Sequence, residues 1–237
     1  MCDVQDAATP GPPPGPARSD ASRTALLDAA ERLFAEHGIP GVSDRTIAQA
    51  AGQRNHSAVA YHFGGREGLL GALVDRHTWS LEEDRRRYFD GSTTLLGDVR
   101  SLVLPLTDAL ERLPAPTWRA RFLARALAHQ EAGALLRRRL DQTPMSQAIG
   151  ASVLRRIDHL DPAVIEGRIS LMAQIVVTSC ADMERSAAQG EPARWSAVGT
   201  FLSDALAGML GAPSSLVVGG MPVVRSGPEQ NTGAARP

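Results

Sequence analysis

The residues with the most distinctive chemistry lie between Ser43 and Glu67, in the segment SDRTIAQAAGQRNHSAVAYHFGGRE. From Arg45 to Arg66 this segment contains no Asp or Glu, and its basic side chains are arginines and histidines. A polar surface without acids can approach a phosphate backbone without repulsion between like charges. Arginine can also bind phosphate or guanine through two hydrogen bonds at once. The segment therefore predicts a surface that contacts nucleic acid.

The same segment contains the elements that would position these side chains. The spacing predicts a short helix from Asp44 to Ala51, a turn over residues 52–54, and a second short helix over residues 55–62. Gly52 tolerates the positive φ that such a turn requires, and Ala48 is small enough to pack against the second helix. Two helices joined by a tight glycine-containing turn predict a helix-turn-helix, whose second helix can enter the DNA major groove.

The apolar spacing of the second helix indicates which side chains face outward. Val59 and Phe63 are expected to face the interior, which leaves the neighbouring residues partly outward. Short polar groups fit base edges, whereas Tyr61 and His62 can reach phosphates. Arg66 adds a cation and free N–H groups at the start of the next helix. The predicted DNA-binding residues are Arg45, Thr46, Arg54, Asn55, His56, Ser57, Ala58, Tyr61, His62 and Arg66.

The composition of the whole chain limits this interpretation. The 237 residues carry a formal net charge of −1, so any attraction to nucleic acid must be local. Cys2 and Cys180 are too few for a disulfide framework or a zinc site, and reduced thiols fit the cytoplasm. The N-terminus lacks an apolar signal core, and the longest charge-free apolar run, residues 169–181, is shorter than the roughly 18 residues of a membrane span. We expect a soluble, cytoplasmic protein with no membrane partner.

Helical periodicity continues beyond the helix-turn-helix, so the predicted fold class is all-α. Residues 1–18 and 212–237 are rich in Gly and Pro and predict tails. Between them we expect a three-helix DNA-binding domain over residues 19–66 and a larger helical bundle for ligand binding and dimerisation over residues 67–211. Further helices are predicted over residues 19–37, 66–89, 94–113 with a kink at Pro105, 117–131, 145–159 after a break near Pro144, 162–189 and 192–210.

The last two predicted helices are apolar on more than one side, so they need neighbours on all sides. Meeting their symmetry mates would give a four-helix bundle between two subunits, although a monomeric core would satisfy the same pattern. The predicted dimerisation residues are Ile175, Trp195, Val198, Phe201 and Leu202.

A ligand pocket is predicted less directly. His129 stands near the end of an apolar helix, where a polar group could orient a ligand or could serve only as a hydrogen-bonded structural histidine. The aromatic residues nearby could line the pocket or pack in the core. The predicted ligand-binding residues are Trp79, Trp118, Phe122 and His129.

Enzymatic and metal chemistry find no support in the sequence. It contains no glycine-rich phosphate loop, nucleophile elbow or acid pair at a plausible spacing. His56 and His62 are six residues apart, which does not place them on one helical face as a metal pair. We therefore expect no enzyme activity, no metal and no cofactor.

Several separate stretches resemble, in order, the N-terminal domain of the tetracycline-repressor (TetR) family of transcriptional regulators. They are ALLDAAERLFAEHG, SDRTIAQAAG and AYHFGGREGLLGALV, within residues 23–77. The resemblance departs at Gln53, where the family usually has an apolar residue, and in the length of residues 52–63, which is one residue greater than in the commonest form. The register of the DNA contacts around residues 53–57 therefore stays open, whereas the family's roles transfer most directly to Tyr61, His62 and Arg66.

The resemblance implies a homodimeric repressor that binds a palindromic operator in double-stranded DNA. A small-molecule effector in the larger helical domain would control the spacing of the two DNA-binding domains; we expect it to be largely apolar. The rival hypothesis is a ligand-binding or scaffold protein whose helix-turn-helix no longer binds DNA. The sequence leaves open the operator, the effector, the regulated genes and whether binding represses or activates.

Overall fold

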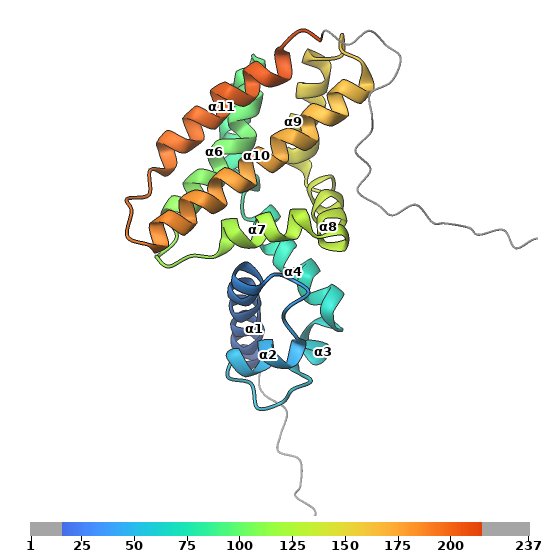
Figure 1. The fold of residues 1–237 in the computed structure, drawn as a ribbon. Coiled ribbons are helices and arrows are strands. Elements are labelled where there is room, and N and C mark those ends of the chain that lie inside the picture. Colours follow the sequence, from blue (N-terminus) through green and yellow to red (C-terminus); the bar gives the residue numbers. More distant parts are fainter. Residues whose placement is uncertain (1–15, 215–237) are drawn as a thin grey trace, which may run out of the picture.

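The computed structural model describes residues 16–214, and every regular element in this part of the chain is an α-helix. Figure 1 shows α1–α3, here called the head, at one end of the molecule, and α5–α11, here called the body, at the other, with α4 connecting them. The helices are α1 (Pro16–His37), α2 (Asp44–Ala50), α3 (Ala58–Phe63), α4 (Arg66–Trp79), α5 (Glu82–Phe89), α6 (Leu95–Arg112), α7 (Arg119–Ala128), α8 (Gln130–Leu140), α9 (Pro144–Arg156), α10 (Pro162–Ala188) and α11 (Trp195–Gly211).

Individual residue types determine where the helices of the head begin and end. Gly38 ends α1 at a φ of 77°, as predicted for a glycine in this place. The Ser43 hydroxyl caps α2 by accepting the N–H of Thr46 at 3.1 Å. Gly52 has a φ of 69° and donates its N–H to Gln49, while the next residue bonds back to Ala48. This pair of bonds is a Schellman motif, so the predicted turn after α2 is confirmed.

One apolar cluster runs through the head and continues into the body. Phe34 of α1 stacks on Phe122 of α7 with ring centroids 6.2 Å apart, and Phe122 also contacts the ring of His77 from α4. The domain boundary expected after residue 66 thus falls at the start of α4, in the middle of a continuous core. A second cluster lies farther out in the body, where α6, α9 and α11 bury Val99, Ile149 and Leu206.

The helix predicted over residues 66–89 is in fact two helices, α4 and α5. The hydroxyl of Thr78 bonds back to the carbonyl of Val74, and Ser80 bonds back to His77, which offers the backbone an alternative to a continuing helix. Three acids follow at once in the first turn of α5, where the helix dipole favours them. The prediction of one long helix was therefore wrong.

The helix predicted over residues 117–131 is also broken, at His129. This residue has extended backbone angles, and its Nδ1 lies 3.4 Å from the N–H of Ala132, which it caps at the start of α8. Gly133 allows the sharp corner, because a Cβ there would lie 2.8 Å from the carbonyl oxygen of Leu127. The break predicted near Pro144 is confirmed, since α9 begins at that residue, and Pro105 lies inside α6.

Smaller differences concern the ends of helices. α3 begins three residues later than predicted, and so does α11. α1 begins at Pro16, within the segment predicted as a tail, whereas the rest of that tail and residues 215–237 lie outside the described residues. By length and composition alone, α10 could cross a membrane, which is weak evidence because core helices of soluble proteins pass the same test.

Candidate nucleic-acid interface

The outer end of the head presents an exposed polar surface. Arg45 and Thr46 are exposed in the first turn of α2, and Tyr61 of α3 is 70 % exposed although it is aromatic. The Tyr61 ring stands edge-on against the ring of His62, with centroids 4.9 Å apart. An exposed tyrosine can offer its hydroxyl to a phosphate and its ring to a sugar.

The turn between α2 and α3 carries four further exposed polar residues: Arg54, Asn55, His56 and Ser57. The Asn55 side chain accepts the backbone N–H of Ser57 at 2.9 Å, forming a local turn that competes with helix formation. This turn explains why α3 starts only at Ala58. The four residues thus precede α3 instead of forming its first turn.

One predicted contact residue on α3 is placed differently from expectation. Ala58 was expected to face outward, but it is only 4 % exposed and packs beside Val59 in the core of the head. The first two residues of α3, Ala58 and Val59, are therefore both buried. His62 is half-buried between Tyr61 and Phe63.

Arg66 differs more strongly from the prediction, because its side chain has partners inside the head. Its guanidinium lies 3.1 Å from a carboxylate oxygen of Asp44 and donates to the carbonyl oxygen of Ile39. The same group lies over the ring of Phe34, 4.6 Å from the centroid. The guanidinium thereby ties the start of α4 to α1 and α2, and this structural role is what the sequence reasoning missed.

Two residues that the sequence analysis did not single out share this surface. Gln49 is exposed three residues after Thr46 and four after Arg45, so the three lie on one face of α2. Ala60 is exposed beside Tyr61, and its methyl group could contact a thymine methyl. Helical spacing from Arg45 would have identified Gln49.

The charges around this surface leave it without a free acid at its centre. Asp44 is the acid nearest in sequence on the α2 side, and its carboxylate is paired with Arg66. In addition, the chain has no acid between the exposed arginines Arg45 and Arg54. Among residues 16–214, no group of three His, Cys, Asp or Glu side chains could hold a metal ion.

None of the four predicted ligand-binding residues lines either of two hollows that the described part of the chain contains. Trp79 is 53 % exposed at the end of α4, whereas Phe122 is fully buried in the shared core. Trp118 donates its Nε1–H to Glu36 of α1 at 3.2 Å, and His129 caps α8. A hollow between α1, α4 and α8 and another beside α11 are both lined by other residues.

The predicted dimerisation residues separate into two groups. Trp195 and Leu202 are buried in the core of the protomer, at 4 % and 3 % exposure. Ile175 and Val198 are half-buried, and Phe201 is 70 % exposed on α11. Only the second group leaves apolar surface free for a partner.

The sequence of the head matches known bacterial proteins. Residues 26–73 match the family model described as bacterial regulatory proteins, tetR family. The transcriptional repressor AcnR of Corynebacterium glutamicum, of the helix-turn-helix type, is 42 % identical over 53 residues. The AcnR of Corynebacterium efficiens shows the same identity over the same length. The match spans 22 % of this chain and 28 % of the length of these relatives.

The fold of the whole chain resembles solved structures at low sequence identity. A TetR family transcription regulator from Marinobacter aquaeolei VT8 superposes with a TM-score of 0.57 at 18 % identity, covering 81 % of this chain and 97 % of that one. A candidate regulator of the same family from Shewanella sp. PV-4 gives a TM-score of 0.54 at 19 % identity, covering 78 % and 95 %. These likenesses show the fold: an N-terminal helix-turn-helix followed by a helical bundle.

Proposed function

We propose that this chain is a DNA-binding transcriptional repressor of the tetR family that acts as a homodimer, since its residues 26–73 match the model of that family. The corynebacterial relatives that share the head are named transcriptional repressors. A regulator that reads chromosomal DNA would work in the cytoplasm, and no catalysis is part of the proposal.

One observation carries the proposal: the exposed side chains of α2, of the turn after it and of Tyr61 on α3 are mostly polar, and residues 45–66 contain no Asp or Glu. The overall charge of the chain is slightly negative, so this surface differs from the rest of the molecule. A local surface of this kind supports a few well-placed phosphate contacts, with α3 and the residues before it in the major groove.

The homodimer is supported by apolar side chains left in contact with water on α10 and α11. Leu171 is 45 % exposed and Phe201 is 70 % exposed, and both are large. The half-buried Ile175 and Val198 lie on the same two helices. Apolar surface of this kind commonly marks an interface. A second copy, related by a two-fold axis, would cover it and would place the two heads on half-sites of a palindromic operator about 34 Å apart.

Release by a small, largely apolar effector completes the proposal. An effector that binds more tightly to a form with a different head spacing must weaken DNA binding by linkage. A coupling of about 1–3 kcal/mol would change operator affinity by roughly 5- to 150-fold. Because Trp79, Trp118, Phe122 and His129 line neither of the two hollows described above, we assign no residue to the effector site.

The experiment is to select binding fragments from the protein's own genome and then measure affinity for the selected site against salt concentration. Tyr61→Ala is expected to weaken binding at least about tenfold through a lost backbone contact, and Arg54→Ala to reduce the slope of log affinity against log salt by about one. The matched controls are Tyr88→Ala and Arg138→Ala, which make the same changes on exposed residues of the body.

Equal losses in the head and body variants would contradict the proposed interface. A wild-type protein that selects no fragment and shows no salt-dependent binding would contradict DNA binding altogether. That second result would favour the ligand-binding or scaffold protein with an inactive helix-turn-helix.

A further inference from the structure

α7 is the element of the body that packs on both α1 of the head and α10. Figure 1 shows it lying across the junction between head and body. α4 joins the two parts through the chain itself, and α7 adds a second connection between them through packing. The way in which the first turn of α7 is held therefore bears on the placement of the head.

The first turn of α7 has no cap from its own sequence. Its N-cap residue is Trp118, whose side chain makes no capping hydrogen bond. The first N–H groups of a helix need an acceptor, which the side chain at this position commonly supplies. Here the acceptor comes from α10, more than sixty residues farther along the chain.

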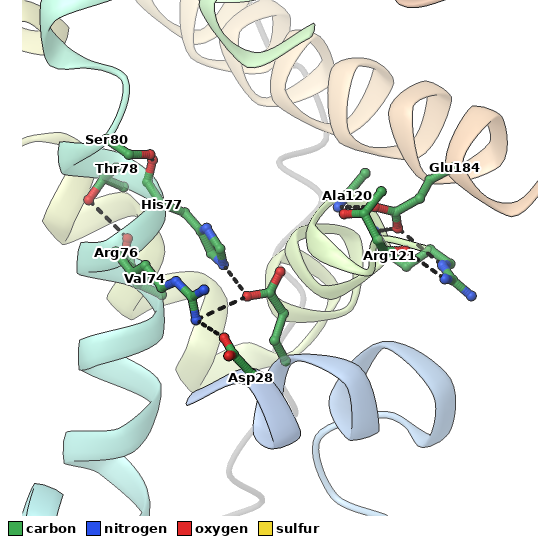
Figure 2. A network of polar contacts seen from close by, with 11 residues as sticks. Asp28, Val74, Arg76, His77, Thr78, Ser80, Ala120, Arg121 and Glu184 are labelled. Atoms are coloured by element: carbon green, nitrogen blue, oxygen red, sulfur yellow. Dashed lines mark hydrogen bonds and ion pairs between the residues drawn. The ribbon is translucent and has the colours of Figure 1, made fainter. Parts of the chain in front are cut away.

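Glu184 of α10 takes the place of the missing cap. Its side chain is 1 % exposed and accepts the backbone N–H groups of Ala120 at 3.2 Å and Arg121 at 3.0 Å (Figure 2). It also accepts the Nε–H of Arg121 at 3.1 Å and the hydroxyl of Thr117 at 3.2 Å. A buried carboxylate is costly without such partners, so these hydrogen bonds fix the start of α7 to α10.

The same short stretch of chain also contacts the head. Because the Trp118 side chain does not cap α7, it is available to α1, and its Nε1–H donates to the carboxylate of Glu36 at 3.2 Å. One turn later, the buried ring of Phe122 stacks on the ring of Phe34 from α1, with centroids 6.2 Å apart. The start of α7 therefore contacts α10 and α1 at once.

α10 also carries part of the apolar surface through which the proposed dimer would form. On this helix Leu171 is exposed and Ile175 is half-buried, and both precede Glu184. One continuous helix holds all three residues, so its backbone fixes the distances between them. The placement of α10 against a second copy would therefore be passed on to the start of α7.

We propose that Glu184 and Trp118 are positioning residues for DNA recognition: together they carry the placement of α10, through the start of α7, to α1 of the head. The spacing of the two heads in a dimer is then set from α10. The connection within one protomer exists whether or not the chain binds DNA; only its consequence for head spacing rests on the proposed function.

A panel of operators tests positioning separately from stability. Each operator carries the selected half-sites with base pairs added or removed between them, and each base pair moves one half-site by about 3.4 Å and rotates it by about 35°. We expect the parent to prefer its own spacing by a factor of about 5 to 150, and Glu184→Gln to bring that factor close to 1. A variant that is only less stable would bind less at every spacing and keep the preference.

Two further variants accompany Glu184→Gln. Trp118→Phe keeps an aromatic ring and leaves the bonds of Glu184 in place, but it removes the donor to Glu36. It should therefore weaken the spacing preference while the melting temperature is maintained. Glu166→Gln makes the same change as Glu184→Gln at an exposed position of α10 and should retain the preference.

Distances between spin labels on the head and the body test the connection without DNA. Ala50→Cys in the head and Ala151→Cys on α9 provide two exposed sites. Cys2→Ser removes a competing thiol, and burial raises the pKa of the Cys180 thiol to about 12, so it is not labelled in the folded chain. Labelled protein is mixed with an excess of unlabelled protein, so that pairs within one protomer dominate the signal.

The narrow distance distribution expected of the parent should broaden or shift in Glu184→Gln and Trp118→Phe, but not in Glu166→Gln. Parent-like distances in both of the first two variants would overturn the connection, and Trp118→Phe alone decides if Glu184→Gln does not fold. Altered distances with the spacing preference of the parent would overturn the role in recognition. Altered distances in a protein that never binds DNA would support the connection and contradict only the proposed function.

Discussion

The guanidinium of Arg66 has three partners in the head: the carboxylate of Asp44, the carbonyl oxygen of Ile39 and the face of the Phe34 ring. These partners are 22 to 32 positions away along the chain, so no local pattern in the sequence could reveal them. An arginine at the start of a helix beside a helix-turn-helix predicts a phosphate contact, and the same chemistry serves an internal carboxylate equally well. At this position the fold decides which partner the side chain meets.

Replacing Arg66 therefore tests stability before it tests DNA binding. Arg66→Ala is expected to lower the free energy of unfolding by about 1–3 kcal/mol, because it leaves a carbonyl oxygen and a carboxylate without their donor. Arg45→Ala, on the exposed face of α2, should change it by about 0.5 kcal/mol or less. Denaturant unfolding followed by circular dichroism measures both. A loss for Arg66→Ala no larger than that for Arg45→Ala would refute the structural role.

At the scale of elements, the sequence predicts helix ends well where a single residue type enforces them. Gly38, Gly52 and Pro162 each mark an end that the structure contains, because their backbone preferences act locally. The breaks between consecutive helices at Ser80 and His129 were not predicted. There the apolar period continues across the break, and the helix ends because hydroxyl and imidazole groups bond to the backbone where the core requires a corner.

Two glycine-to-alanine substitutions, one in the turn after α2 and one inside a helix, test the role of backbone conformation in this turn. Gly52→Ala is expected to cost about 1–2 kcal/mol, since a φ of 69° strains an L-residue although nothing lies within 4 Å of the added methyl group. Gly150→Ala also adds a methyl group into open space, but in the interior of α9, so it should stabilise by about 0.5–1 kcal/mol. Thermal melts of the two variants should move in opposite directions. Parallel shifts would refute the argument from backbone strain.

At the scale of the whole molecule, the exposed apolar face of α10 and α11 bears on whether the chain is a monomer or a dimer. The sequence predicted that these helices need neighbours, but it could not separate those inside the protomer from those outside. Trp195 and Leu202 find theirs within the chain, while Phe201 projects into solvent. The difference follows from how α11 packs along α6, a tertiary contact over about a hundred residues of sequence.

Phe201→Glu should therefore separate the proposed dimer. An aromatic side chain at the centre of an interface commonly contributes at least about 2 kcal/mol, so the dimer dissociation constant should rise at least about 30-fold. Leu154→Glu places the same charge on a 43 % exposed apolar residue of α9 and should leave assembly unchanged. Sedimentation equilibrium measures both variants. A parent protein that sediments as a monomer at every concentration would rule out the homodimer.

Glu184 of α10 caps α7 by accepting the backbone N–H groups of Ala120 and Arg121, and this contact has a consequence for the order in which the chain folds during synthesis. The first turn of α7 follows Trp118, yet the carboxylate that completes it arrives more than sixty residues later. During synthesis the helix-turn-helix can form while this turn still lacks its acceptor. The contact between α7 and α10 can therefore be completed only after α10 has left the ribosome.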